Sequence, residues 1–338
     1  MRGDQNIIKL SESFVRLRIT YLRDQDIGLF AYDYDQTWMS FFLDADARIY
    51  CRYGSRDATS ADSHNSATGL LATMRRVLAL HQEESAKEKP EHKLPPPVRP
   101  GDLPGIRALN YGGSCIRCHM VNEAFLAQKR KEGKLDVWFY PPPDNIGLQL
   151  DKIEGDLVRA VTPESLADNA GLKAGDRIRH ANGSRVLTHA DLQFVLNGLE
   201  NKSKLTLEVE RDGKPVTADL ELDGDWRRSD VTWRKSVRIM TYRALPVAGA
   251  LAPLPAADRM KHQIAEGDLA LRVIYVTPPI QQLGFRQNDV IVAFDGKRQP
   301  PAYKVPQLFF YLDHKSGDKV EVTLLRDGKE EMLTLTLP

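Results

Sequence analysis

The residues with the clearest capacity for chemistry form one short run, Cys115-Ile116-Arg117-Cys118-His119, which holds two of the chain's three cysteines. The spacing C-x-x-C-H is that of covalent c-type haem attachment, in which two thioethers hold the porphyrin and the adjacent imidazole is an axial ligand of the iron. The same spacing suits a dithiol that cycles with a disulfide. A zinc site needs a further ligand, for which His92 is the upstream candidate. Haem c, thiol redox or metal chemistry, and inert cysteines all stay open for Cys115, Cys118 and His119.

A haem at this motif lacks an obvious second protein ligand for its iron. No methionine lies between Met120 and Met240, so the sequence does not predict a cytochrome with one histidine and one methionine ligand. Attachment of c-type haem also needs an extracytoplasmic setting, yet Met1-Arg2-Gly3-Asp4 opens no apolar signal-peptide core. We therefore expect a periplasmic or otherwise extracytoplasmic protein whose natural N-terminus differs from residue 1, or else a motif without haem.

The composition of the 338-residue chain indicates globular material divided into about two or three domains. Its 47 Lys and Arg residues nearly balance its 46 Asp and Glu residues, so no bulk charge attracts nucleic acid or an anionic membrane. Three cysteines are too few for a disulfide scaffold, and no apolar run reaches the length of a membrane span. The sequence therefore predicts no nucleic-acid partner and no transmembrane segment.

The part of the chain after the motif contains an internal duplication. Gly171, Asp176 and Gly183 recur as Gly284, Asp289 and Gly296, each 113 residues later. The run Arg-Asp-Gly-Lys at 211–214 recurs at 326–329, which is 115 residues later, so two residues are inserted between these anchors. Both copies also carry a dipeptide typical of tight hairpins, Asn182-Gly183 and Asp295-Gly296. Two β-rich domains of one kind are therefore predicted, at 141–223 and at 224–338, the second including a connector at 224–263.

The run from Ser165 to Gly183 resembles the core of the bacterial PDZ domain family, in which Ala-Gly-Leu-x-x-Gly-Asp precedes a strand. The resemblance implies two PDZ-like β-barrel or sandwich domains that bind an extended peptide as an added strand, with loop amides on its C-terminal carboxylate. By this resemblance the peptide-binding residues of the first copy are Asn145, Ile146, Gly147 and Leu148 in the loop, Leu150 on the edge strand, and His189, Leu192 and Leu196 on the facing helix. The alternative is that these residues only fill the core.

In the second copy, the stretch Glu266-Gly267-Asp268-Leu269 is the expected equivalent of the carboxylate-binding loop. Its two acidic residues would repel a carboxylate. We therefore expect the second copy to bind internal peptide segments or to be structural.

Residues 1–88 alternate helix and strand signals. Helical patterns cover 6–14 and 66–80, whereas 15–20, 38–43 and 48–53 have the period of strands. This order, with the hairpin run from Phe41 to Tyr50, resembles the second half of a thioredoxin fold. We therefore expect 1–88 to be an incomplete thioredoxin-like α/β domain without the thioredoxin cysteines, in which Cys51 is a buried structural residue.

Residues 89–140 join this domain to the duplicated part. The chain around them is polar and proline-rich, as in Glu88-Lys89-Pro90 and Pro95-Pro96-Pro97, which is typical of an extended linker. A short helical segment with the C-x-x-C-H motif follows it. The fold class expected is a multidomain α+β chain with a truncated thioredoxin-like domain, this helical segment and two PDZ-like domains.

The whole arrangement resembles a family of bacterial thioredoxin-like/PDZ domain-containing proteins, some of them selenoproteins. The resemblance implies an extracytoplasmic scaffold that binds protein or peptide C-termini through the first PDZ domain and carries a redox centre, either c-type haem or a dithiol. The alternative is a purely structural or interaction PDZ scaffold without redox activity.

Bacterial PDZ tandems often follow a trypsin-like protease domain. The sequence holds no Gly-Asx-Ser-Gly-Gly nucleophile segment, and 1–140 is too short for a double β-barrel. The prediction is that the chain is not a serine protease and that any activity is thiol–disulfide or electron-transfer chemistry.

Overall fold

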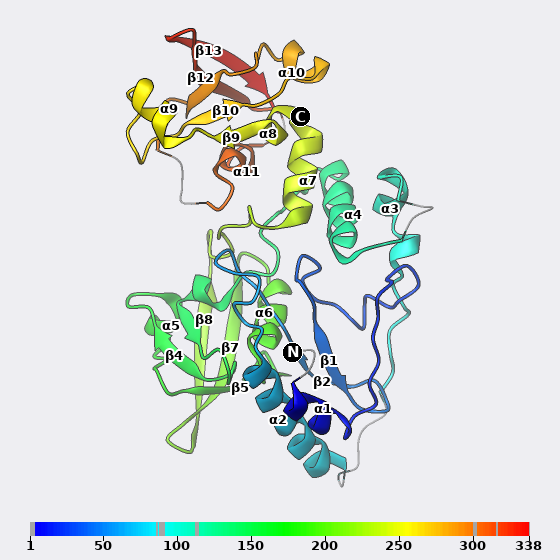
Figure 1. Cartoon of the computed structure of the whole chain (residues 1–338). Helices are drawn as coiled ribbons and strands as arrows, with labels where there is room; N and C mark the ends of the chain where they lie inside the picture. The colour runs from blue at the N-terminus through cyan, green and yellow to red at the C-terminus, as the bar shows by residue number, and fades with distance from the viewer. Residues whose placement is uncertain are drawn as a thin grey trace. The chain divides into compact units, whose positions relative to one another are not determined.

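The computed structural model describes residues 4–85, 87, 92–111, 115–299, 303–315 and 317–337 (Figure 1). It divides into two compact units. Unit 1 is Met1–Ala124 with Trp138–Ser229, and unit 2 is Phe125–Val137 with Asp230–Pro338. The linker run Glu88-Lys89-Pro90 lies outside the described residues.

The N-terminal part of unit 1 is a small hairpin with two helices. Helix α1 (Gln5–Ser11) begins at Asp4, whose carboxylate accepts two backbone N–H groups of the first turn. Strands β1 (Ser40–Leu43) and β2 (Ile49–Tyr53) pair antiparallel, and α2 (Ala67–Ser85) follows. Cys51 of β2 is buried in a cluster with Tyr50 and Val77, which confirms the prediction that it is a structural residue.

The strand predicted at 15–20 is wrong. These residues form neither helix nor strand, and the side chains of Val15 and Leu17 are almost fully exposed. An alternating pattern stabilises a strand only where a neighbouring strand and a core receive it. In the described part of 1–88 the sheet has two strands, so the strand that the thioredoxin resemblance places before the hairpin is not there.

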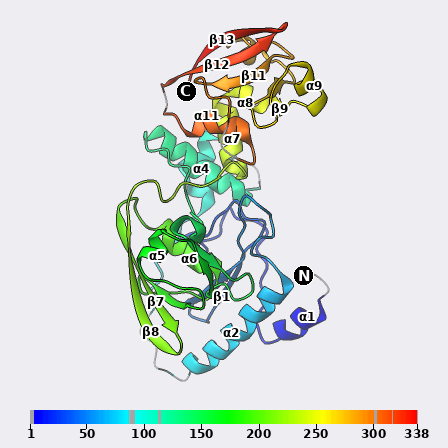
Figure 2. The ribbon, with the colours of Figure 1, turned by 90° about the vertical axis from the view of Figure 1, so that its left-hand side faces the viewer.

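The rest of unit 1 is β-rich. Its strands are β3 (Leu148–Leu150), β4 (Val158–Val161), β5 (Arg177–Ala181), β6 (Ser184–Arg185), β7 (Ser203–Arg211) and β8 (Lys214–Leu222). They form a two-stranded sheet β3-β4 and a four-stranded sheet β6-β5-β7-β8. The short helix α5 (Leu166–Asn169) and the helix α6 (His189–Asn197) complete the fold. Figure 2 shows the long β7–β8 hairpin beside α5 and α6.

Alternating side chains of this region build its core. Leu205, Leu207 and Val209 of β7 point inward and are buried, as the period of a half-buried strand requires. Leu192 and Leu196 of α6 join the same cluster. Both Asn182 and Gly183 have positive φ, of 46° and 74°, which confirms the tight-hairpin prediction for this pair.

Unit 2 contains a five-stranded antiparallel sheet of order β13-β12-β11-β10-β9. Its strands are β9 (Leu251–Pro253), β10 (Leu271–Val273), β11 (Val290–Phe294), β12 (Lys319–Arg326) and β13 (Lys329–Thr336). Its helices are α7 (Lys235–Ala244), α8 (Pro246–Gly249), α9 (Ala256–Lys261), α10 (Pro278–Gln282), η3 (Pro306–Leu308) and α11 (Phe309–Leu312). The segment expected to be a connector thus supplies β9 to this sheet.

One ion pair occurs in both copies of the duplication. Arg211 Nε donates to Asp176 Oδ1 at 2.6 Å, and Arg326 Nε donates to Asp289 Oδ1 at 2.9 Å. Each arginine also donates from Nη2 to the carbonyl of the first glycine of the repeated pattern: Arg211 to Gly171 at 2.8 Å, and Arg326 to Gly284 at 2.9 Å. The two halves recognised from residue spacing are therefore built around the same buried contact.

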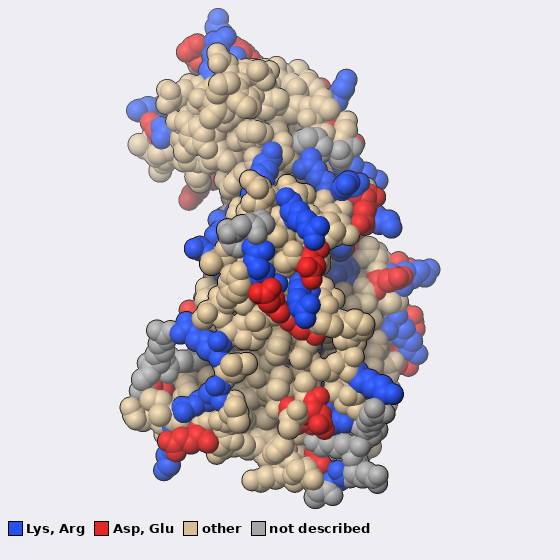
Figure 3. All heavy atoms as spheres, turned by 90° about the vertical axis from the view of Figure 1, so that its right-hand side faces the viewer, with Lys and Arg blue, Asp and Glu red and all other residues tan. Residues whose placement is uncertain are grey.

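None of the helices in the described residues is long and apolar enough to cross a bilayer. On the face drawn in Figure 3, Lys and Arg side chains are interspersed with Asp and Glu side chains. This mixture agrees with the net charge of +1.

Candidate functional site

The loop predicted to hold a peptide carboxylate, 145–148, covers the end of the 3-10 helix η2 (Pro143–Ile146), Gly147 and the first residue of β3. Gly147 has a φ of +88°, and a Cβ on it would lie 2.0 Å from Ser165 Oγ. Glycine is therefore required here both by the backbone conformation and by the close approach of Ser165. The Gly147 carbonyl accepts the N–H of Thr162 at 2.9 Å, which fixes the loop against the end of β4.

The predicted peptide-binding residues come together as two walls. Ile146, Leu148 and Leu150 lie on the η2–β3 wall, and Leu192 and Leu196 lie on α6. These five side chains are all buried in one hydrophobic cluster. Their burial is what the alternative of core-filling residues predicts. The exposed Gln149 lies on β3, which in the described residues pairs only with β4.

One stripe of α6 contacts chain segments from outside this β-rich fold. His189, Gln193 and Asn197 follow one another at four-residue spacing, so they share a helix face. Gln193 accepts from Ser55 Oγ at 2.8 Å and donates to the Tyr140 carbonyl at 2.8 Å. Asn197 accepts the N–H of Tyr140 at 2.8 Å. Part of the helix wall expected to face a peptide is thus occupied by the chain itself.

The N-terminus of α6 is joined to strand β2. Thr188 and Asp191 form a capping box, in which each side chain accepts a hydrogen bond from the backbone N–H of the other residue. The Asp191 carboxylate also accepts the N–H of Arg52 at 2.8 Å, and the Thr188 hydroxyl donates to the Arg52 carbonyl. The Arg52 guanidinium lies 3.7 Å from the ring centroid of Phe194. Figures 1 and 2 both draw α6 between the β5-β7-β8 strands and the β1–β2 hairpin.

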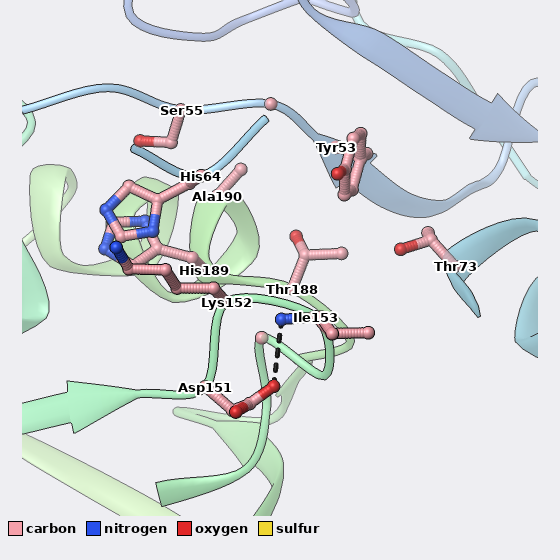
Figure 4. A pocket seen from close by; sticks show the side chains of 12 residues that line it. Tyr53, Ser55, His64, Thr73, Asp151, Lys152, Ile153, Thr188, His189 and Ala190 are labelled. Atoms are coloured by element: carbon pink, nitrogen blue, oxygen red, sulfur yellow. Dashed lines mark hydrogen bonds between the residues drawn. The ribbon is translucent and has the colours of Figure 1, made fainter. Parts of the chain in front are cut away.

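His189 is sealed beneath a second histidine. Its ring stacks on that of His64 at a centroid distance of 3.7 Å and an interplanar angle of 17° (Figure 4). Neither of its ring nitrogens has a hydrogen-bond partner in the described part of the chain. Burial, followed by the nearby His64, holds the pKa of His189 well below its ordinary value. The ring is therefore neutral at pH 7.

The carboxylate of Asp57 lies beside the His64 ring that stacks on His189. His64 Nε2 lies 3.5 Å from Asp57 Oδ2. Burial alone would raise the pKa of Asp57, but hydrogen bonds from His64, Ser63 and two backbone N–H groups keep this pKa well below its ordinary value. The pocket drawn in Figure 4 lies beside the stacked rings and is also lined by Tyr53, Thr73 and the β3–β4 turn.

The cysteine motif lies at the start of α4 (Cys118–Lys131), separate from α6 in the sequence. Cys115 is exposed, Cys118 is half-buried, and both thiols are free. Ile116 and Val121 are buried and anchor the segment. The Tyr32 hydroxyl donates to Cys118 Sγ at 3.3 Å. Burial and then Cys118 raise the pKa of Tyr32, so its hydroxyl keeps its proton.

His119 has a carboxylate partner that the sequence reasoning missed. Its Nδ1 lies 2.8 Å from Glu123 Oε1, one helical turn further along α4. The Glu123 side chain is fully buried, and its Oε2 accepts the Tyr111 hydroxyl at 2.6 Å. The spacing of four residues between a histidine and a glutamate on one helix was the signal that could have found this pair.

The structure does not assemble the zinc alternative. Within the described residues no group of three or more His, Cys, Asp and Glu side chains could hold a metal ion. His92, the proposed further ligand, is exposed.

The expected carboxylate loop of the second copy is corrected by the sheet topology. β9 is an edge strand of that sheet, as β3 is of its own, and the chain reaches β9 through α8 and Ala250. Ile274 N donates to the Ala250 carbonyl at 2.9 Å, as Thr162 N donates to Gly147 in the first copy. Residues 266–269 instead lead into β10, so the two acids on which the repulsion argument depended are not in the equivalent loop.

Comparison with known proteins identifies one domain. Residues 145–222 match the family described as PDZ domain, so the chain contains a PDZ domain. A "Probable periplasmic serine endoprotease DegP-like" of Marinomonas sp. is 28% identical over 179 residues, which are 53% of this chain and 36% of that protein. The "Periplasmic serine endoprotease DegP" of Escherichia coli (strain K12) is 29% identical over 168 residues, which are 50% of this chain and 31% of that protein. The chain thus spans about a third of the length of these curated relatives.

A solved structure, "HtrA-type protease AlgWS227A with decapeptide", is also similar. It shares 12% sequence identity and a TM-score of 0.23, with 39% of this chain and 40% of that chain covered. A similarity of this size carries no argument about the arrangement of the chain.

Two expectations change with these findings. The prediction that the chain is not a serine protease is contradicted, because its relatives are described as serine endoproteases. That prediction depended on one missing motif and on the length of 1–140, and neither tests relatedness. The relatives are not thioredoxin-like, so the thioredoxin resemblance and the predicted redox role receive no support from them, whereas the PDZ domain does.

Proposed function

We propose that this protein is a periplasmic protein-binding scaffold that holds an extended peptide along β3 of its PDZ domain. The observation that carries the proposal is the PDZ match over 145–222, together with a strand β3 that pairs on one side only in the described residues. An edge of this kind offers backbone N–H and C=O groups to an added strand. The periplasmic setting is supported by the relatives, which are described as periplasmic.

The roles of the site residues follow from their burial. Asn145, Ile146, Gly147 and Leu148 shape the loop that receives a C-terminal carboxylate, and Leu150 continues it along β3. Leu192 and Leu196 are fully buried and fix α6 on the core that it shares with β3. His189 lies at the first turn of α6, where the upstream end of a peptide would pass.

A peptide that extends to His189 must displace the residues of this chain that now contact that end of α6. Ser55 and His64 now contact the α6 stripe that includes Gln193 and His189. These contacts are one hydrogen bond and one ring stack, each worth on the order of 1 kcal/mol. The segment 55–64, which makes these two contacts, therefore acts as an internal competitor that a peptide of moderate affinity displaces, whereas Arg52 stays bound to the N-terminus of α6.

The test uses the full chain and fluorescein-labelled hexapeptides with apolar C-terminal residues, each made with a free carboxylate and as the amide. Fluorescence anisotropy is expected to show binding of free-carboxylate peptides at least tenfold tighter than that of their amides. Hydrogen exchange of the complex is expected to protect 145–150. Equal affinity of both forms, or protection elsewhere only, would contradict the proposal.

Serine endoprotease activity is a second candidate function, favoured by the descriptions of the relatives. A fluorophosphonate probe labels activated serines, and hydrolysis of casein measures turnover directly. Labelling of the full chain together with hydrolysis would support this candidate. If the chain binds peptides but neither reacts with the probe nor cleaves casein, only the proposed scaffold function remains.

A further inference from the structure

Two thiols and one imidazole that peptide binding does not use lie together at the start of α4. Cys115 is exposed and Cys118 is half-buried, and neither forms a disulfide. The helix begins at Cys118, so His119 lies in its first turn. Buried Ile116 and Val121 hold this segment in place, which leaves the reactive groups accessible on an anchored backbone.

His119 is oriented in the manner of a metal-binding histidine. Its Nδ1 lies 2.8 Å from the fully buried Glu123 carboxylate, which also accepts from Tyr111 at 2.6 Å. Histidines that bind metals usually donate the other ring N–H to a carboxylate, because this fixes the tautomer and makes the ligating nitrogen more basic. In the neutral tautomer whose Nδ1–H donates to this carboxylate, Nε2 carries the lone pair that a metal ion binds.

The protein ligands available suit haem better than a bare ion. A structural zinc ion takes about four protein ligands. In the described residues no group of three or more candidate ligands exists. Haem brings four nitrogen ligands of its own, so one imidazole is enough to hold its iron on one side. The two neighbouring thiols supply the attachment that a single ligand does not.

We propose that Cys115, Cys118 and His119 form a covalent attachment site for haem, in which Glu123 is a positioning residue for the imidazole. Each thiol adds across one vinyl group of haem: the sulfur forms a bond to one vinyl carbon, and the thiol hydrogen goes to the other. No atom is lost and no external oxidant is consumed. The periplasmic setting proposed above is the compartment in which such attachment takes place, but peptide binding and haem attachment are measured independently.

The experiment is export of the full chain, behind an added signal peptide, to the periplasm of a bacterium with haem-attachment machinery. The expected result is haem that stays with the protein after denaturation and acid–acetone extraction, with an intact mass equal to the sum of protein and haem. The double variant Cys115→Ala/Cys118→Ala is expected to lose all of it. Cys51→Ala, which changes the buried third cysteine, is the matched control and is expected to retain haem.

Glu123 needs a readout that a merely structural role would not move. Glu123→Gln keeps the size of the side chain but removes its charge, so the imidazole becomes a weaker donor to the iron. We expect the covalent haem to remain and its reduction potential to rise, while Glu123→Asp restores part of the shift. An unchanged potential in Glu123→Gln would overturn the positioning role.

A wild-type chain that reaches the periplasm folded, as judged by circular dichroism, but carries no covalent haem would overturn the attachment site. A co-expressed c-type cytochrome shows in the same cells that the machinery is working. Appearance of a reversible Cys115–Cys118 disulfide in the exported protein in place of haem would also overturn it and assign the motif to thiol chemistry.

Discussion

Among single residues, the buried aspartate of the ion pair in each PDZ-like half has the largest expected effect on stability. Asp176 is fully buried and accepts from Arg211 at 2.6 and 2.7 Å and from the N–H of Lys173 at 2.8 Å. Burial alone would raise its pKa, but the arginine and the backbone N–H outweigh burial and lower it. The carboxylate is therefore ionised in the folded protein.

Asp176→Asn is expected to lower the free energy of unfolding of unit 1 by roughly 3 kcal/mol, because it leaves Arg211 without its charge partner. Urea denaturation followed by circular dichroism measures the change. Asp219→Asn, which alters the exposed pair with Lys204, is the control and should have no measurable effect. Equal losses in both variants would show that the Asp176 pair has no special role.

His189 makes the stability of unit 1 depend on pH. Its folded pKa is lowered by burial and by His64, so the folded state binds fewer protons than the unfolded state below about pH 6.5. Stability is fully present above the unfolded pKa and is lost as pH falls toward the folded pKa, with a slope of about 1.4 kcal/mol per pH unit. Urea midpoints at pH 7.5, 6.0 and 5.0 test this.

The variant His189→Leu should remove that slope, whereas His180→Ala, at a half-exposed position on β5, should keep it. If His189→Leu and the wild type lose stability in parallel below pH 6.5, another group is responsible.

Among the elements, helix α6 contacts both the PDZ core and segments outside the PDZ domain, and the second set of contacts limits access of a peptide to α6. Its inner face packs on the PDZ core, while its outer stripe contacts Ser55, His64 and Tyr140. Weakening the outer contacts of Ser55 and His64 lowers the cost of displacing segment 55–64 and leaves the core unchanged. Ser55→Ala/His64→Ala is therefore expected to raise the affinity for free-carboxylate peptides by about fivefold to tenfold, in line with one to two lost contacts.

Anisotropy titration of the same peptides measures this gain. Thr59→Ala/Asp62→Ala changes exposed side chains of the same segment and should leave the affinity as it was. A weaker affinity in Ser55→Ala/His64→Ala would mean that these side chains belong to the binding site and do not compete for it.

Several elements could be read from the sequence, and the reasons are local. Helix α2, the β1–β2 hairpin and the turn at Asn182-Gly183 follow from patterns within a few residues, and the structure has all three. The contact of Arg52 with Asp191 joins residues 139 positions apart, and no local pattern indicates it. The loop before β9 was misplaced because 17 residues separate β9 from β10, whereas 7 separate β3 from β4, so the spacing that aligned the later anchors did not apply.

At the scale of the whole molecule, each unit has its own hydrophobic core. The cluster around Leu192 and Leu205 lies in unit 1, and the cluster around Phe285 and Val322 lies in unit 2. Domains with separate cores commonly unfold in separate transitions. We expect calorimetry to resolve two transitions, with Asp176→Asn lowering the midpoint of one and Asp289→Asn that of the other. A single transition shifted equally by both variants would show that the units unfold together.

The candidate sites were predictable to different depths. The loop, the edge strand and the facing helix were predicted by the resemblance to the PDZ family, whose model matches 145–222. The carboxylate behind His119 was missed although its four-residue spacing on one helix was visible in the sequence. The histidine above His189 was missed because the two rings meet only in three dimensions. A motif therefore located the reactive groups here, while only the structure revealed the partners that tune them.

The bare side chains of Val15 and Leu17 have a practical consequence for handling the protein. They alternate with Arg16 and Arg18 along residues that form no helix or strand, so this stretch exposes both apolar groups and free backbone. Two copies of such an extended stretch can pair as strands of an intermolecular sheet, and the charge repulsion between their arginines opposes this pairing. High ionic strength screens that repulsion. We therefore expect sedimentation and turbidity measurements to detect self-association first in concentrated samples at high salt.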